Sequence, residues 1–166
     1  MVTIREIRED DALGFLALLT QLDQESRFML VEPGERQTTA AEQCERIRQV
    51  LAQPNATILV AECDGQVIGH VAALGGPYRR NRHTAHVVIG ILRAFTGLGL
   101  GTRLLETLEQ WARSHEIHRL ELTVMTHNER AIWLCSKVGY QIEGVQKDSL
   151  RVDGQYVDEY RMAKVL

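Results

Sequence analysis

The pattern of apolar and polar residues in the first third of the chain predicts one strand followed by two helices. Residues 3–8 alternate apolar and polar side chains, as a half-buried strand does. Residues 10–25 open with carboxylates that complement a helix dipole and then carry apolar residues at helical spacing. Thr39 and Glu42 have the spacing of a capping box, so a second helix is expected to begin there and to end near Pro54.

Three strand-like runs follow in succession. Residues 56–63 and 66–74 are separated by Asp64-Gly65, a dipeptide that tolerates the positive φ angles of a tight hairpin turn, so we expect an antiparallel pair. Residues 84–92 are nearly all apolar. This third run is therefore expected to be a central strand that is covered on both faces.

The next two elements predict a helix and a parallel strand. Apolar residues recur at helical spacing from Leu100 to Trp111, and charged residues occupy the other faces, which predicts an amphipathic helix. Residues 119–125 read as a strand. Because a helix separates this strand from residues 84–92, we expect the two strands to be parallel neighbours joined by a crossover.

The last part of the chain predicts one more helix and a closing hairpin. Asn128 is suited to cap a helix that ends at Gly139, where a left-handed residue is favoured. Residues 140–150 and 155–165 then flank a turn over residues 151–154. The predicted fold class is α/β, with a central sheet of mixed strand direction.

Length and composition restrict the class of protein. The 166 residues, 45% of them hydrophobic, fit one domain over residues 1–166 with a substantial core. The net charge of −3 gives no general field that would attract polyanions, so we expect neither nucleic acid nor a membrane surface as the main partner. A small molecule becomes the expected ligand.

Cysteine content and hydropathy indicate a soluble protein of a reducing compartment. Cys44, Cys63 and Cys135 are odd in number and widely spaced, so neither a disulfide framework nor a metal site is expected. The charged N-terminus and the lack of an apolar run of about 18 residues predict neither a signal peptide nor a membrane span. We expect a cytoplasmic location.

Three glycines at alternate positions stand between the third strand-like run and the amphipathic helix: Gly97, Gly99 and Gly101. Such a turn can hold a pyrophosphate, because the first amides of the helix have no internal partner and the missing side chains leave room for phosphate oxygens. A nucleoside-triphosphate loop is excluded, since Thr102 follows Gly101 where a lysine is required. A dinucleotide fingerprint is disfavoured because its third glycine would fall at Thr102, although Glu121 lies at the spacing of the ribose-binding acid.

The glycine turn and two later motifs resemble the Gcn5-related N-acetyltransferases (GNAT superfamily). Thr96 to Gly101 matches both glycine positions of the motif Q/R-x-x-G-x-G/A, with Thr96 in place of glutamine or arginine. Residues 120–144 resemble the second motif, N-x-x-A-x-x-L-Y followed by K-x-G-F/Y-x-x-x-G. Residues 152–162 resemble the ending of a bacterial branch related to ribosomal-protein and polyamine acetyltransferases.

The resemblance implies a fold and a cosubstrate. The implied fold is a mostly antiparallel sheet of about seven strands with helices on both faces and with strands 4 and 5 splayed apart. Acetyl-CoA would lie with its pyrophosphate on the glycine turn and its pantetheine arm in the gap between the splayed strands. The residues expected to bind it are Ile89, Gly90, Ile91, Thr96, Gly97, Leu98, Gly99, Leu100, Gly101, Thr102 and Asn128.

Two residues are candidates for proton transfer, each with a simpler alternative. Many relatives have a tyrosine that protonates the leaving thiolate at the place of Cys135, whose thiol could serve as this acid or could be a small core residue. His86 is the titratable side chain within the strand 84–92 and could be the base that takes the ammonium proton. A packed histidine, with water carrying the proton away, is the alternative.

The implied function is transfer of an acetyl group from acetyl-CoA to a primary amine of a small molecule or peptide by direct attack, and relatives often form homodimers. Phe28, Met29 and Glu32 lie in the segment that forms one wall of the acceptor site in relatives, and Glu25 and Asp158 could attract an ammonium group. The basic run of residues 78–83 is expected to be a solvated loop rather than a nucleic-acid patch or a grip on the CoA 3′-phosphate. A non-catalytic acyl-CoA sensor is the alternative function.

Overall fold

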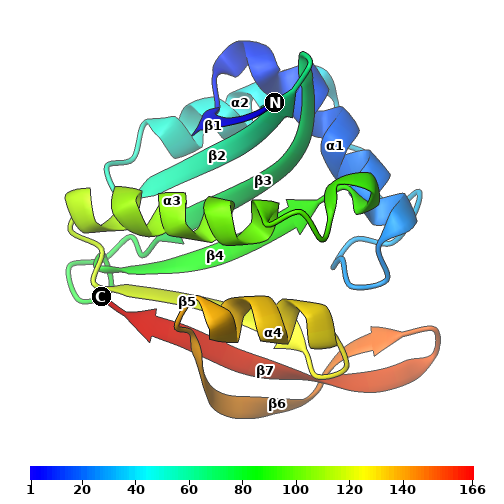
Figure 1. The fold of residues 1–166 in the computed structure, drawn as a ribbon, viewed down its shortest axis with the longest axis vertical. Coiled ribbons are helices and arrows are strands. Elements are labelled where there is room, and N and C mark those ends of the chain that lie inside the picture. Colours follow the sequence, from blue (N-terminus) through cyan, green and yellow to red (C-terminus); the bar gives the residue numbers. More distant parts are fainter.

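The computed structural model describes all 166 residues and has a single seven-stranded sheet (Figure 1). The strand order is β1-β2-β3-β4-β5-β7-β6, and every neighbouring pair is antiparallel except β4 and β5, which are parallel. The expected GNAT-type sheet is thus confirmed. The strands are β1 (Val2–Glu6), β2 (Ala56–Cys63), β3 (Gln66–Gly75), β4 (Thr84–Ile91), β5 (Arg119–Met125), β6 (Gln141–Val152) and β7 (Gln155–Val165).

Four helices cover the sheet. They are α1 (Ala12–Glu25), α2 (Ala40–Leu51), α3 (Leu100–Ser114) and α4 (Glu129–Lys137), and short 3₁₀ turns lie at Glu9–Asp11 and Arg93–Phe95. Figure 1 shows α3 and α4 on the near face of the sheet, with α1 and α2 on the opposite face. No helix combines the length and the hydropathy of a transmembrane span.

The local signals in the sequence produce the expected ends and turns. The hydroxyl of Thr39 accepts a hydrogen bond from the Glu42 amide at 3.2 Å, and the side chain of Asn128 accepts one from the Ala131 amide at 3.3 Å. Asp64 and Gly65 have φ angles of 50° and 78°, as the tight β2–β3 hairpin requires. These short-range predictions are confirmed.

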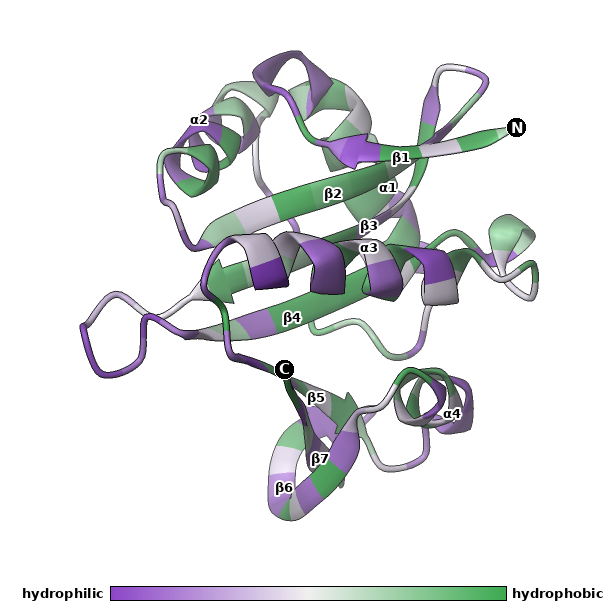
Figure 2. Cartoon of the chain, turned by 60° about the vertical axis from the view of Figure 1, so that its left-hand side comes forward, coloured by the Kyte–Doolittle hydropathy of each residue, from purple (hydrophilic) through white to green (hydrophobic).

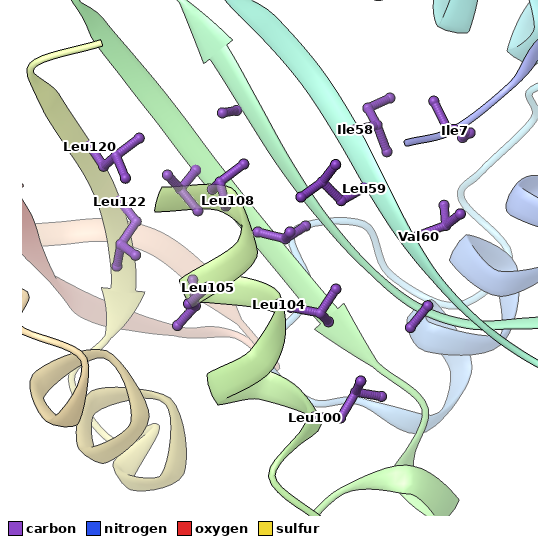
Figure 3. Close-up of a cluster of buried hydrophobic side chains, with 14 of the residues drawn as sticks. Ile7, Ile58, Leu59, Val60, Leu100, Leu104, Leu105, Leu108, Leu120 and Leu122 are labelled. Atoms are coloured by element: carbon purple, nitrogen blue, oxygen red, sulfur yellow. The ribbon is translucent and has the colours of Figure 1, made fainter. Parts of the chain in front are cut away.

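The core lies on both faces of the sheet, under α1 and α2 on one side and under α3 on the other. Figure 3 shows leucines of α3 close to side chains from β2 and β5, and Leu104, Leu105 and Leu108 are at most 2% exposed. Figure 2 shows apolar residues concentrated in β2, β3 and β4, whereas the β6–β7 hairpin mixes apolar and polar residues. The core therefore holds β4 and α3 in fixed relative positions, and the turn between them is anchored at both ends.

The structure corrects one prediction about β4. The sequence predicted a strand covered on both faces, but burial alternates: Ala85 and Val87 are buried under α3, while His86 is exposed and Val88 is 41% exposed. The reason is that α1 covers only the far end of β4, where Leu22 packs against Gly90. An apolar run alone does not show how far the covering helix extends.

Candidate functional site

The strands β4 and β5 separate after a short parallel ladder. The paired residues are Thr84 with Arg119, Ala85 with Leu120, and His86 with Glu121, and the pairing ends there. Beyond it β4 continues to Ile91 and β5 to Met125. The expected splaying of strands 4 and 5 is confirmed, and it leaves main-chain groups of a central strand without a strand partner.

The register of β3 with β4 identifies which main-chain groups face this gap. The Leu92 amide donates to the Ile68 carbonyl at 2.9 Å, and the antiparallel pairing is regular from Gly69–Ile91 to Gly75–Ala85. In an antiparallel ladder the N–H and C=O of one residue point to the same neighbouring strand, and those of the next residue point to the strand on the other side. The N–H and C=O of Ile89 and Ile91 therefore point toward β5 and the gap, whereas those of Gly90 point toward β3.

A cleft of about 400 Å³ opens at the gap. It brings together four segments that are distant in sequence: the end of α1 with the residues after it, the end of β4, the turn before α3, and the start of α4. Its lining residues are Leu22, Glu25, Ser26, Arg27, Phe28, Met29, Ile89, Gly90, Ile91, Arg93, Thr96, Asn128, Arg130, Ala131 and Leu134.

Two of the three alternate glycines form an open turn. Gly97 and Gly99 have φ angles of 77° and 81°, which L-residues with side chains rarely adopt, and nothing lies within 4 Å of the position where a Cβ would stand. Gly99 is the N-cap of α3, and no side chain caps this helix. The first amides of α3 thus have no side-chain cap and the space beside Gly97 and Gly99 is open, so the turn fits a phosphate group.

The third glycine has a different role. A Cβ on Gly101 would lie 2.6 Å from Leu134 Cδ2 and 3.4 Å from Ile91 Cδ1, so its small size permits α3 to pack against α4 and β4. Leu100 likewise has a buried side chain, while Leu98 is 75% exposed. Because the Leu100 side chain is buried and Gly101 has none, these two residues can bind a ligand only through their main-chain groups.

Thr96 and Asn128, two of the residues expected to bind the coenzyme, both line the cleft, and both make local hydrogen bonds. The Thr96 hydroxyl donates to the Arg93 carbonyl at 2.7 Å, which tightens the turn. The Asn128 oxygen caps α4, so its capping role is present in the structure. Its amide N–H groups make no hydrogen bond within the protein and stay available to a ligand.

The two candidate proton-transfer residues lie in very different surroundings. Cys135 is 2% exposed and does not line the cleft, and burial raises the pKa of its thiol to about 11. His86 is exposed at the end of the β4–β5 ladder, and its imidazole has no hydrogen-bond partner in the protein. A buried thiol with a raised pKa is a weak acid at neutral pH, whereas the His86 imidazole is open to water.

The acceptor-wall residues predicted after the first helix are partly in the cleft. Phe28 and Met29 line it, and the centroid of the Phe28 ring lies 5.2 Å from that of His127, the residue before Asn128. Glu25 also lines it, but its carboxylate accepts a hydrogen bond from the Arg93 amide. Glu32 does not line the cleft, and Asp158 accepts a hydrogen bond from the Asp148 amide in the β6–β7 hairpin.

An ion pair between Arg36 and Asp23, which the sequence pattern does not predict, fixes the segment that carries Phe28 and Met29. The Arg36 guanidinium donates to both carboxylate oxygens of Asp23, at 2.7 and 3.1 Å, and Asp23 is 2% exposed. The pair ties the segment after α1 to the helix itself. Arg27 and Arg130 are further cleft residues that sequence patterns do not identify, because exposed arginines are common on any surface.

The basic run of residues 78–83 forms the loop between β3 and β4. It is exposed, as predicted, and its turn is fixed by hydrogen bonds of the Asn81 and Asn55 side chains. This loop precedes β4, whereas the glycine turn follows it. The loop and the glycine turn therefore lie at opposite ends of the strand, too far apart to share one coenzyme phosphate group.

Comparison with known proteins identifies the family. A sequence model of the acetyltransferase (GNAT) family matches residues 11–140. The L-amino acid N-acetyltransferase AaaT of Escherichia coli is 34% identical over 117 residues, which cover 68% of this chain and 70% of that protein. N-alpha-acetyltransferase RimI of Mycobacterium tuberculosis is 33% identical over 118 residues, or 69% of each chain. Spermidine N(1)-acetyltransferase of E. coli is 29% identical over 104 residues, covering 62% and 55%.

Solved structures agree with this result. A GNAT-family acetyltransferase of Streptococcus pneumoniae superposes with a TM-score of 0.97 at 30% identity, and the match covers all of both chains. A phosphinothricin acetyltransferase of Sinorhizobium meliloti, solved in complex with acetyl-CoA, has the same fold, with a TM-score of 0.86 at 19% identity over 99% of this chain and 88% of that one. Motifs, splayed strands and relatives all lead to one conclusion: the chain belongs to the GNAT family and is an acetyl-CoA-dependent N-acetyltransferase.

Proposed function

We propose that the enzyme transfers the acetyl group directly to a primary amine, with no covalent acyl-enzyme. The observation that carries this proposal is the cleft between the splayed strands. It reaches from Thr96 in the glycine turn, past Ile89 and Ile91, to the wall formed by Phe28 and Met29. A cleft that joins a phosphate-binding turn to an apolar wall can hold two substrates in contact.

We assign cosubstrate binding to main-chain groups. The amides of Gly97 to Thr102 hold the pyrophosphate, and the free N–H and C=O groups of Ile89 and Ile91 pair with the pantetheine arm as an added strand would. Asn128 is placed to donate its free amide to the same arm. Bound acetyl-CoA supplies the activated thioester. A main-chain N–H in the gap stabilises the negative charge that develops on the carbonyl oxygen under attack.

We assign removal of the ammonium proton to water and His86, and protonation of the leaving CoA thiolate to water rather than to Cys135. The acceptor must lose a proton before or during attack, and the cleft opens to solvent that can accept it. His86 lies four residues along β4 from Gly90, about 13 Å at ~3.3 Å per residue, so it can act only through water. Cys135, buried and with a raised pKa, is assigned to packing.

The acceptor class that fits best is the α-amino group of an amino acid or of a peptide N-terminus. Apart from Arg130, which is assigned to the coenzyme below, two arginines line the cleft, Arg27 and Arg93, against one acidic residue, Glu25, whose carboxylate is already hydrogen-bonded. This charge disfavours a polycation and favours an acceptor that carries a carboxylate or is neutral. Two of the relatives are named for L-amino acid and N-alpha acetylation, which is consistent with this preference.

A panel assay tests the proposal. Release of CoA thiol is followed with acetyl-CoA and each of the twenty L-amino acids, short peptides with free N-termini, spermidine and an aminoglycoside. We expect turnover with members of the first two groups, and mass spectrometry should locate the acetyl group on the α-nitrogen. Preference for spermidine would overturn the acceptor class, and calorimetric binding of CoA without turnover on the whole panel would overturn direct transfer.

A further inference from the structure

The side chain at the start of the glycine turn adds no charge to the proposed diphosphate site. Thr96 is short and uncharged, and its hydroxyl donates to the Arg93 carbonyl at 2.7 Å. The guanidinium of Arg93 keeps its charge, but one of its N–H groups donates to the main-chain carbonyl of Glu25 and so directs the side chain toward the end of α1. Main-chain amides alone carry only partial charges, so a diphosphate at this turn would be incompletely neutralised.

A free cation lies across the cleft in the first turn of α4. Arg130 lines the same cleft as Thr96, is exposed, and makes no hydrogen bond or ion pair within the protein. Figure 1 shows that α3 and α4 both begin at the same end of the sheet, so the start of α4 faces the turn that opens α3. Three elements thus converge at this end of the cleft: the turn, the end of β4 and the start of α4.

The position of Arg130 is unfavourable for the helix itself. A positive side chain in the first turn opposes the helix dipole, and no neighbouring carboxylate pairs with it. The same turn holds Glu129, which has the favourable sign, so the helix does not need the arginine for its own stability. The side chain of Arg130 is thus free to bind an anion in the cleft that it lines.

We propose that Arg130 supplies from α4 the phosphate-binding charge that Thr96 does not supply from the turn. Its planar guanidinium donates to the coenzyme pyrophosphate while the amides of Gly97 to Thr102 hold the opposite side. The proposal rests on the assignment of the pyrophosphate to the glycine turn. The proposal adds a residue of α4 to a phosphate-binding site otherwise built from one turn. The start of α4 then forms part of the coenzyme-binding site.

Calorimetric titration tests this role without any need for turnover. Arg130→Gln should weaken CoA binding by about 10- to 100-fold, the value of a charged hydrogen bond to an anion. Arg27→Gln is the matched control, because it removes the same charge from a lining residue of the same cleft that follows α1 and does not belong to α4. It should change the affinity by less than about threefold. Thermal melting should show that both exposed substitutions leave the fold intact.

A series of shortened ligands locates the contact. The loss caused by Arg130→Gln should persist with 3′-dephospho-CoA, which keeps the diphosphate, and should vanish with pantetheine, which has no phosphate. The double variant Thr96→Arg with Arg130→Gln should recover most of the affinity, since it returns the charge from the turn. Recovery would not occur if Arg130 acted only through helix stability.

Each of the other outcomes has a definite meaning. Equal losses in Arg130→Gln and Arg27→Gln would show a general field effect and overturn the proposal, as would an unchanged affinity. A loss that disappears with 3′-dephospho-CoA would place Arg130 on the 3′-phosphate and also overturn it. Failure of the unmodified protein to bind CoA would instead refute the glycine-turn assignment, so the two failures can be told apart.

Discussion

Replacement of Arg36 by methionine should be one of the most destabilising single changes near the cleft. The Asp23 carboxylate is 2% exposed and receives two hydrogen bonds from the Arg36 guanidinium, at 2.7 and 3.1 Å. Arg36→Met keeps much of the apolar stem but leaves this carboxylate buried without its counter-ion. A buried pair broken in this way loses about 3–5 kcal/mol of the free energy of unfolding.

The double variant separates the pair from its surroundings. Asp23→Leu together with Arg36→Met removes both charges and fills the site with apolar atoms of similar volume. Because the desolvation cost then disappears along with the attraction, the double variant should recover most of the loss and lie within about 1–2 kcal/mol of the unmodified protein. The pair also anchors the segment that carries Phe28 and Met29, so Arg36→Met should raise KM for the acceptor more than KM for acetyl-CoA.

Urea denaturation followed by far-ultraviolet circular dichroism at pH 7 measures the free energies, and steady-state kinetics give the two KM values. The reasoning would be refuted by a loss below about 1 kcal/mol in Arg36→Met. It would equally be refuted if the double variant were as unstable as the sum of its parts, since the two charges would then act independently.

Three further predictions concern the turn, the thiol and a buried imidazole. Gly99→Ala should weaken acetyl-CoA binding at least about tenfold, because its methyl group enters the open turn at φ 81°. Gly65→Ala is the control, because Gly65 in the β2–β3 hairpin has a φ of 78° and equally open surroundings. It should lose about as much stability as Gly99→Ala, about 1–2 kcal/mol, without any change in acetyl-CoA affinity. Equal acetyl-CoA binding by the two variants would contradict the turn assignment. Cys135→Ala should keep kcat within about threefold and lose about 1 kcal/mol of stability, whereas a large fall in kcat with unchanged acetyl-CoA affinity would restore the thiol as the acid. Burial, with a smaller effect of Arg36, lowers the pKa of His70 to about 4, so between about pH 6.5 and 4 the unfolded chain binds a proton that the folded chain does not. The free energy of unfolding should therefore fall with falling pH over this range by up to about 1.4 kcal/mol per pH unit. His70→Leu should make the plot of unfolding free energy against pH flatter. Parallel plots for this variant and the unmodified protein would contradict the assignment of the pH dependence to His70.

Local signals made the order of elements readable from the sequence. Asp64-Gly65, Thr39, Asn128 and Gly139 each act through the conformation or hydrogen bonds of a few neighbouring residues, and each has the predicted role in the structure. The parallel pairing of β4 with β5 could also be predicted, because a helix between two strands restricts how they can lie in one sheet. Such features depend on contacts within about a dozen residues.

Contacts between distant segments were not readable in the same way. The three alternate glycines look equivalent in the sequence, yet two open the turn and Gly101 makes room for Leu134 of another helix. Likewise, an apolar run could not show that α1 stops short of Val88, and nothing near Arg36 in the sequence indicates that it meets Asp23.

The sequence by itself determined the family, the order of helices and strands and the position of the glycine turn, because these follow from motifs, periodicity, capping and turn chemistry within short stretches. Only the tertiary structure decided which main-chain groups of β4 face the gap, that Cys135 is enclosed while His86 is exposed, and which arginines enter the cleft. The physical reason is that burial and the arrangement of charges in a cleft depend on side chains brought together from several elements. That arrangement exists only once the sheet and helices have packed.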